Sequence, residues 1–222
     1  MTQNTDTTHT VRSSPLTVAV LGAGGGVGRQ VVHTLIQQGH AVRALVRKQE
    51  QADALEHLGA VTVLGDLTGD WAAVLEGTDA VIWAAGAGAS GDFEQIDGQA
   101  LKQVSDRLAV GGPKRLIVVS SMGVDRPEQM PPFLGSVLRV KAVSDAHVQA
   151  STLDFTIVRP GGLTNEQGSG RVSAGFPVQG GMIPREDVAA VVLACLNDAG
   201  TIGKTFEVVS GEQPVTEALA LI

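Results

Sequence analysis

A glycine-dense stretch carries the clearest chemical signal in this sequence. Residues 16–28 read L-T-V-A-V-L-G-A-G-G-G-V-G, so an apolar run passes directly into glycines. Glycine lets the backbone turn tightly and lets a phosphate group approach within hydrogen-bonding distance. The free N–H groups and the dipole at the start of a following helix favour that anion. The stretch predicts a dinucleotide-binding turn formed by Gly22, Gly24, Gly25, Gly26, Val27 and Gly28.

The spacing of these glycines is Gly22-x-x-Gly25-x-x-Gly28, which differs from the strict G-x-G-x-x-G pattern. A purely structural tight turn is therefore the alternative. Three features favour the binding site. The turn follows the first predicted strand, a second strand comes after one helix, and that second strand ends in a charged residue where a ribose should lie.

The end of the second predicted strand indicates which dinucleotide binds. Many dinucleotide-binding proteins carry an acid there, which accepts a hydrogen bond from the ribose 2′-hydroxyl. This sequence has Arg47 and Lys48 instead, with Arg43 nearby. A guanidinium group pairs with a phosphate in a fork, so the predicted cofactor is NADP(H) rather than NAD(H). The alternative is a solvated basic pair on a surface loop.

The ends of the third and fourth predicted strands supply further candidates. Asp66, followed by Leu67, could accept a hydrogen bond from the adenine amino group. An aspartate before a helix is equally a routine cap, so both interpretations stay open. The small residues Ala84, Ala85 and Gly86 would let a backbone pass close to a ribose, and a plain turn is the alternative.

These candidates must be positioned by regular elements. Short apolar runs predict strands, and apolar residues spaced three or four apart predict helices. The predicted strands are 16–21, 41–46, 61–64, 80–83, 115–119, 155–158 and, as the last of the chain, 206–209. The predicted helices lie at 27–36, 52–58, 71–75, 96–110, 137–150 and 185–196. The alternation predicts one α/β domain over 15–222, a Rossmann fold with a doubly wound parallel sheet.

Two segments without a regular pattern are expected beside the carboxyl ends of the strands. Residues 125–135 contain three prolines and predict an irregular flap. Residues 160–181 are long and rich in glycine, which predicts a substrate lid. Ligands bind at this edge of a doubly wound sheet.

Composition and charge argue against several classes of function. The formal net charge of the 222 residues is −7, which argues against a nucleic-acid or anionic membrane surface. Residues 1–14 are polar and lack the apolar core of a secretory signal, so a flexible tail and a cytoplasmic protein are expected. Cys195 lies in an apolar pattern and is expected in the core. His33, His57 and His147 show no ligand spacing, so no metal site is expected.

Several motifs together resemble a known family. They are G-A-G-G-G-V-G at 22–28, A-L-V-R at 44–47, G-D-L at 65–67, S-S-M-G at 120–123, I-V-R-P-G at 157–161 and R-E-D-V-A-A-V at 185–191. The sequence resembles the atypical short-chain dehydrogenases/reductases, in particular the single-domain NAD(P)H-binding group of biliverdin reductase B/flavin reductase-like and NmrA-like proteins. The resemblance implies that Ser120, Pro160 and Gly161 also contact the cofactor, with the nicotinamide between 120–122 and 160–161.

One departure from that family bears directly on the chemistry. Short-chain dehydrogenases use Tyr-x-x-x-Lys, in which the tyrosine gives or takes the alcohol proton. This chain contains no tyrosine; Lys141 is present, with Val137 in the tyrosine position. Lys141 is expected to bond the nicotinamide ribose, or alternatively to form a surface pair with Asp145. Ser121 is the best hydroxyl left near the nicotinamide.

Two classes of function fit these residues. The first is an NADPH-dependent reductase that passes hydride to a small planar acceptor such as a flavin or quinone, which can take its proton from solvent. The second is a non-enzymatic NADP(H) sensor that reports the cofactor state to a partner protein. An epimerase or dehydratase has no acid/base pair to support it. A monomer or small homo-oligomer is expected.

Overall fold

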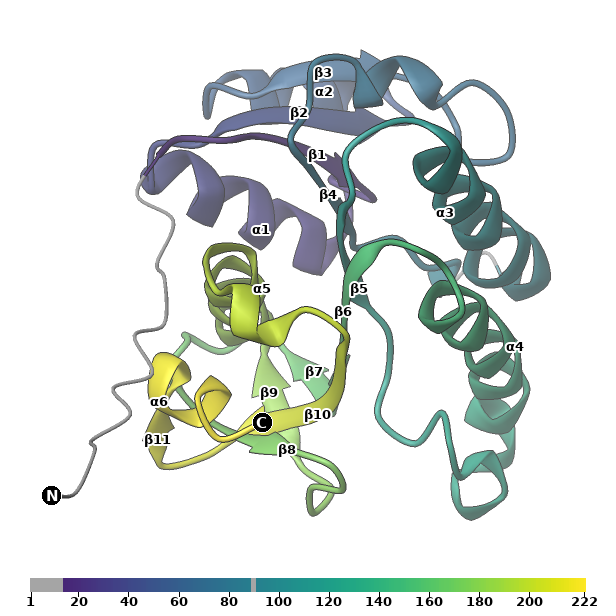
Figure 1. Ribbon diagram of the computed structural model, residues 1–222, viewed down its shortest axis with the longest axis vertical. Coiled ribbons are helices and arrows are strands. Elements are labelled where there is room, and N and C mark those ends of the chain that lie inside the picture. The colour runs from purple at the N-terminus through teal and green to yellow at the C-terminus, as the bar shows by residue number, and fades with distance from the viewer. Residues whose placement is uncertain (1–13, 89–90) are drawn as a thin grey trace, which may run out of the picture.

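The computed structural model describes residues 14–88 and 91–222, so the expected tail lies almost wholly outside the described residues (Figure 1). A sheet of nine strands forms the centre, in the order β11-β8-β10-β6-β5-β4-β1-β2-β3. Its strands are β1 Thr17–Leu21, β2 Ala41–Val46, β3 Val61–Leu64, β4 Ala80–Trp83, β5 Arg115–Val119, β6 Asp154–Pro160, β8 Arg171–Gly175, β10 Lys204–Ser210 and β11 Gln213–Pro214.

Seven neighbouring strands of this sheet, in the order β10-β6-β5-β4-β1-β2-β3, are parallel. The sequence-based prediction of an α/β Rossmann fold is confirmed. The chain reverses its direction of winding at β1, which lies between β2 and β4. In such sheets a crevice opens beyond the carboxyl ends of the strands at this point. The topology therefore places the glycine turn after β1 at the edge where ligands bind.

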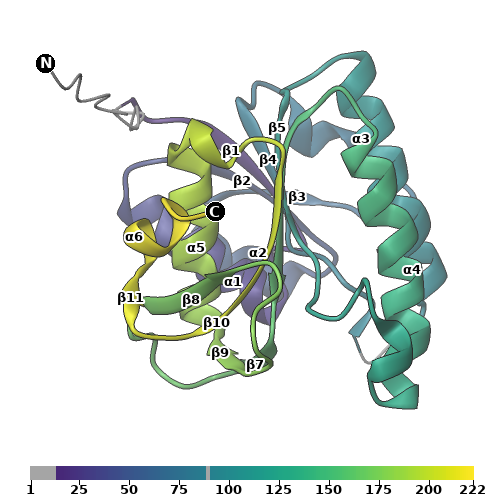
Figure 2. The same cartoon turned by 60° about the horizontal axis from the view of Figure 1, so that its bottom comes forward.

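Helices cover both faces of the sheet. They are α1 Gly26–Gln37, α2 Gln49–Glu56, α3 Leu101–Val110, α4 Pro132–Gln149, α5 Arg185–Asn197 and α6 Val215–Leu219. Buried side chains of α1, α2, α5 and α6 form one apolar core with the sheet, and those of α3 and α4 form a second. Figure 2 shows α1 and α5 on one side of the sheet and α3 and α4 on the other.

The prediction of an irregular lid over 160–181 was wrong. This segment holds β7 Gly162–Thr164, which pairs with β9 Met182–Pro184 directly after the segment, and β8, which joins the main sheet beside β10. The sequence of β8, R-V-S-A-G, has one large apolar residue, Val172, and this side chain is fully buried. Pairing with β10 and burial of Val172 thus make a strand from residues of weak pattern.

Other element boundaries also differ from the predictions. The expected flap is shorter because α4 begins at Pro132, where a proline fits the first helical turn. The helix expected from residue 96 starts as a π-helix over Glu94–Ala100. The strand over 206–209 is not the last, since β11 and α6 follow it. Residues 71–75 form only a short 3-10 helix, Ala72–Leu75.

A buried histidine fastens the start of the first two strands and makes stability depend on pH. The N–H of Leu16 donates to Nδ1 of His40 over 3.1 Å, and burial lowers the pKa of His40 from its usual value. Below about pH 6.5 the unfolded chain binds a proton here that the folded chain does not. We expect the free energy of unfolding to fall as the pH drops through this range.

Urea unfolding of the wild type and His40→Gln, measured from neutral to mildly acidic pH, tests this expectation. The variant should show a flatter pH dependence. His33→Gln, at an exposed position of α1, is the matched control for the loss of a histidine. An equal pH dependence in the wild type and His40→Gln would contradict the role given to His40.

Candidate functional site

The glycine turn is closed so tightly that side chains do not fit in it. Gly22 has a φ of +87°, and the N–H of Gly25 donates to its carbonyl over 3.0 Å. A Cβ atom on Gly28 would lie 2.1 Å from the same carbonyl oxygen. A Cβ atom on Gly22 would lie 2.5 Å from the nitrogen of Ala85. The turn is therefore packed against itself and against the end of β4.

The start of α1 presents unpaired backbone donors. Its N-cap is Gly25, without a side-chain cap, and its first turn has no acidic residue. Within the described part of the chain, the N–H groups of Gly26, Val27 and Gly28 have no hydrogen-bond acceptor. The Val27 side chain is buried in the core, so only its backbone can face a ligand. This is the donor arrangement that binds phosphate at helix N-termini.

A pocket lies at the carboxyl ends of β1, β2, β3 and β4. It brings together nine of the predicted cofactor residues, which are Gly22, Gly24, Gly25, Arg47, Asp66, Leu67, Ala84, Ala85 and Gly86. The sequence analysis missed six others that line it, which are Leu45, Val46, Gln51, Gly65, Ala87 and Ile96. Residues that follow four strands therefore line one pocket, together with residues from helices.

Gln51 of α2 is the most informative of the missed residues. Its side chain lies over the glycine turn, because a Cβ atom on Gly24 would be 2.5 Å from its Nε2. Its Oε1 accepts a hydrogen bond from the N–H of Arg47 over 3.3 Å. The signal in the sequence is its position one helical turn after Arg47. Gln51 links the glycine turn to the end of β2.

Of the three basic residues predicted near the end of β2, one lines the pocket. Arg47 is exposed and lines the pocket, whereas Lys48 is the N-cap of α2 and does not line it. Arg43 was expected nearby, but its guanidinium donates to the carbonyls of Ala73 and Val74 over 2.7 and 3.1 Å. Arg43 therefore fastens the 3-10 helix after β3, and Arg47 is the guanidinium at the pocket.

Asp66 caps its own turn. Its Oδ1 accepts hydrogen bonds from the N–H and the hydroxyl of Thr68, over 2.8 and 2.6 Å. The bond from the Thr68 hydroxyl is the main cause that lowers the pKa of Asp66, and the charge of Arg47 adds to it. The structure thus shows the capping role, and the position of Asp66 in the pocket leaves the adenine role a proposal.

A second group of predicted residues lies beyond the pocket, at the ends of β5 and β6. The N–H of Ser120 donates to the carbonyl of Val158 and that of Met122 to the carbonyl of Pro160, over 2.8 and 2.9 Å. These bonds bring 120–122 beside Pro160, next to Gly161, and a nicotinamide between the two segments stays a prediction. The hydroxyl of Ser121, half-buried, makes one long bond of 3.3 Å to a carbonyl.

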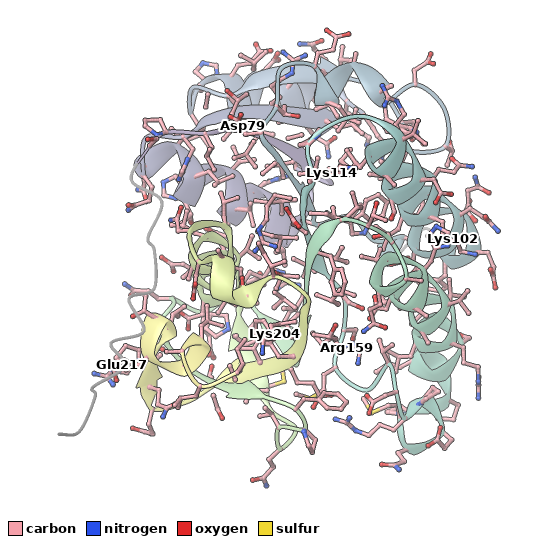
Figure 3. All side chains as sticks on the ribbon, in the orientation of Figure 1. Asp79, Lys102, Lys114, Arg159, Lys204 and Glu217 are labelled. Atoms are coloured by element: carbon pink, nitrogen blue, oxygen red, sulfur yellow. The ribbon has the colours of Figure 1, made fainter. Side chains whose placement is uncertain are left out.

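A buried ion pair lies behind Ser120. Both Nε and Nη2 of Arg159 lie 3.0 Å from Oδ2 of Asp145, which also accepts the hydroxyl of Ser120 over 2.9 Å. Arg159 is on β6 and is labelled in Figure 3, and Asp145 is on α4. Burial raises the pKa of Asp145, and the charge of Arg159 offsets part of this rise. The Ser120 hydroxyl is thereby held toward Asp145.

Glu207 of β10 is a further buried acid at this edge. Its carboxylate accepts from Nη2 of Arg126 over 2.7 Å, and from the N–H groups of Gly123 and Val178 over 3.3 and 3.0 Å. These bonds fasten the loop after β5 to the segment after β8. Glu207 was missed in the sequence analysis, although a single charged residue in the apolar strand F-E-V-V indicates a buried acid with a specific partner.

Lys141 pairs with an acid that the sequence did not suggest. Its Nζ lies 2.7 Å from Oδ1 of Asp97 in the π-helix, and the other oxygen of Asp97 accepts from the N–H of Ala87 over 2.9 Å. The alternative of a surface pair with Asp145 is wrong, because the carboxylate of Asp145 bonds Arg159, and the ribose role of Lys141 stays a prediction. Lys141 is thus connected to the pocket wall at Ala87.

Comparison with known proteins identifies the family. Residues 22–199 match the family model described as NAD(P)H-binding. The chain belongs to this NAD(P)H-binding family. The match begins in the glycine turn and covers most of the chain, in agreement with the resemblance to the atypical short-chain group.

Relatives of this NAD(P)H-binding protein match most of its length. YhfK of Bacillus subtilis, described as an uncharacterized sugar epimerase, is 38% identical in an alignment of 210 residues that covers 91% of this chain and 98% of YhfK. A solved Bacillus halodurans protein, named provisionally as an NAD-dependent epimerase/dehydratase, is 35% identical with a TM-score of 0.88, covering 93% of this chain and 100% of that one. ChuY of Escherichia coli O157:H7, an anaerobillin reductase, is 24% identical with a TM-score of 0.76, covering 88% and 98%.

Other residues of this NAD(P)H-binding protein have structural roles. Cys195 is fully buried, and burial raises the pKa of its thiol to about 12. Nε2 of His147 pairs with Asp106 over 2.6 Å. Across 14–88 and 91–222, no three His, Cys, Asp or Glu side chains are grouped so that they could hold a metal ion. In the same ranges, no helix is long and apolar enough to span a membrane.

Proposed function

We propose that this protein is an NADPH-dependent reductase that transfers hydride to a planar acceptor such as a flavin or quinone. The observation that carries the proposal is a dinucleotide pocket with a guanidinium at the end of β2, in a chain without any tyrosine. ChuY has the same fold and is named a reductase, so the fold is compatible with reductase activity.

The residues present fit such a cofactor. The glycine turn leaves no room for side chains, so its backbone stays bare toward a phosphate, and within the described residues the first turn of α1 offers N–H groups without acceptors. Arg47 would pair with the 2′-phosphate, Asp66 and Ala84 to Gly86 would line the adenosine, and Ser120, Pro160, Gly161 and Lys141 would lie toward the nicotinamide end. NADPH, when bound, supplies the hydride.

In the described part of the chain, no free acid lies at the ends of β5 and β6. Val137 has no proton to give, and the hydroxyl of Ser120 already donates to Asp145. Lys141 is held by Asp97. A simple aldehyde or ketone would need protonation in the site, whereas a quinone or isoalloxazine spreads the arriving charge over its own heteroatoms and takes the proton from water. These residues therefore favour planar acceptors.

The names of the epimerase-like relatives do not decide the reaction of this chain. An epimerase that works through a nicotinamide has to remove a proton from a sugar hydroxyl and return it, which needs an acid/base group in the site. Val137 stands where the family tyrosine would supply it. We therefore keep the reductase as the proposed activity.

The proposal is tested by NADPH oxidation with FMN, riboflavin, menadione and dichlorophenolindophenol, compared with a set of small aldehydes. We expect turnover of about 1 per second or more with at least one planar acceptor, and much weaker reduction of the aldehydes. Tight NADPH binding without turnover of any acceptor would instead indicate a cofactor sensor. Efficient aldehyde reduction would show an acid that this site does not display.

Ser121→Ala should lower kcat/KM for menadione by only about tenfold. Ser121 would act as one hydrogen-bond donor to the acceptor, and the loss of one such bond costs about 1 kcal/mol or slightly more. Ser136→Ala, at an exposed position of α4, is the matched control and should leave kcat/KM unchanged. A loss of a thousandfold or more in Ser121→Ala would mean that this hydroxyl is the missing acid.

A further inference from the structure

We propose that Arg185, the first residue of α5, is a second cationic ligand of the cofactor and binds its pyrophosphate. The motif analysis used R-E-D-V-A-A-V only as part of a family resemblance and gave Arg185 no role. The inference rests on the NADPH binding that the proposed function requires. It concerns a residue far in sequence from the glycine turn.

Arg185 lies directly over the phosphate-binding turn. A Cβ atom on Gly26 would be 2.7 Å from Nε and 2.9 Å from Cδ of Arg185. The reason is the packing of α5 beside α1, which Figures 1 and 2 both show. The first residue of each helix, Gly26 in α1 and Arg185 in α5, meets the other at the same end of the pair.

No acid in the described residues neutralises this guanidinium. The only hydrogen bond that it makes there is to the neutral Oδ1 of Asn165, over 2.8 Å, and no carboxylate lies within 4.0 Å. Glu186 follows it in sequence, but its Oε2 accepts the N–H of Gly168 over 2.8 Å. Asp187 is directed to the same loop.

Asp187, like Glu186, bonds backbone N–H groups of the loop 168–170 and not the guanidinium of Arg185. Its Oδ1 accepts the N–H of Gly170 over 2.7 Å, and its Oδ2 accepts the N–H of Ser169 over 3.0 Å. A cation at a helix N-terminus is opposed by the helix dipole, and the N-terminus of α1 adds a second positive end beside it. Arg185 and the N-terminus of α1 thus meet at Gly26, and among the described residues no carboxylate pairs with the guanidinium or lies in the first turn of α1. A pyrophosphate would supply the anion.

Arg185 and Arg47 are connected to different residues of the glycine turn. Gln51, which bonds the backbone of Arg47, lies over Gly24, whereas Arg185 lies over Gly26. Arg47 would therefore contact the 2′-phosphate, which distinguishes NADPH from NADH. Arg185 would contact the pyrophosphate, which both dinucleotides contain. The two arginines should give different patterns of loss when they are removed.

The test is calorimetric titration of NADPH, NADH and adenosine 2′-monophosphate, which has the 2′-phosphate but no pyrophosphate. Arg185→Ala should weaken NADPH and NADH by a similar factor of about tenfold or more, and leave adenosine 2′-monophosphate unchanged. Arg185→Lys should recover part of the loss, because it keeps the charge without the fork. Asn165→Ala removes the neighbouring bond without the charge and should change affinity little.

Arg171→Ala, an exposed arginine of β8, controls for a general change in net charge, and thermal unfolding of each variant checks that it folds. Unchanged NADPH and NADH affinity in a folded Arg185→Ala would overturn the inference. So would a loss confined to NADPH, or an equal loss for adenosine 2′-monophosphate. If the wild type binds neither dinucleotide, the proposed function fails together with this inference.

Discussion

Replacing Arg159 with methionine should lower the free energy of unfolding by about 3–5 kcal/mol, because it leaves one charge of a buried pair without its partner. The side chains of Arg159 and Asp145 are 8% and 2% exposed. Oδ2 of Asp145 would keep only the hydroxyl of Ser120, and Oδ1 has no hydrogen-bond partner in the described part of the chain. Urea unfolding at neutral pH measures the loss.

The destabilisation should depend on pH in a defined direction. Burial raises the pKa of Asp145, and Arg159→Met removes the charge that offsets this rise. Above the usual aspartate pKa of about 4, the folded variant keeps a proton that the unfolded chain has released. The stability of the variant should therefore fall as the pH rises, and the deficit relative to wild type should be smaller at about pH 5 than at about pH 8.

Two further variants give this prediction its controls. Arg171→Met removes an exposed arginine from β8 and should cost little. Asp145→Asn combined with Arg159→Met removes both charges and should recover part of the stability, since a buried pair is costly mainly when one member is left alone. A loss below about 1 kcal/mol for Arg159→Met, without pH dependence, would show that the pair is not buried in solution.

Arg47→Ala should weaken NADPH binding by about 10- to 150-fold and barely change NADH binding. A hydrogen bond between charged groups contributes about 1.5–3 kcal/mol, which corresponds to this range. Arg47 is the one guanidinium that lines the pocket in the described part of the chain. Dissociation constants for both cofactors, measured by titration on the wild type and the variant, give the comparison.

Lys48→Ala is the control for Arg47→Ala. Lys48 carries the same charge one residue further along, but it caps α2 and does not line the pocket, so its removal should cost less. Equal losses of NADPH and NADH in Arg47→Ala would refute the 2′-phosphate assignment. A wild type that prefers NADH would refute it more directly.

The parallel part of the sheet could be predicted from the sequence because most of its strands are buried on both faces. Such strands are nearly continuous apolar runs, and the predicted bounds of β2, β3, β4 and β5 agree with the structure. β8 could not be found in this way. Apart from Val172 its residues are small or polar, and long-range pairing with β10 and β11 makes it a strand.

The candidate site likewise contains residues that the sequence could predict and residues that it could not. The glycine turn, Arg47 and Asp66 follow strands directly, so their position at the pocket follows from chain order and the carboxyl-end rule. Asp97 and Asp145 come from helices that pack over the sheet, and nothing local in the sequence indicates which side chain each one meets. Their partners depend on packing between elements far apart in the chain, and a π-helix brings Asp97 to Lys141.

The edge strand of the sheet next to β8 is β11, which consists of Gln213 and Pro214. Proline has no N–H to donate, and a strand of this length offers few free backbone groups for another chain to pair with. Aggregation by strand addition therefore finds no template on this strand. The cofactor pocket lies instead at the ends of the strands, so it can stay open to solvent without exposing the chain to fibre growth along that edge.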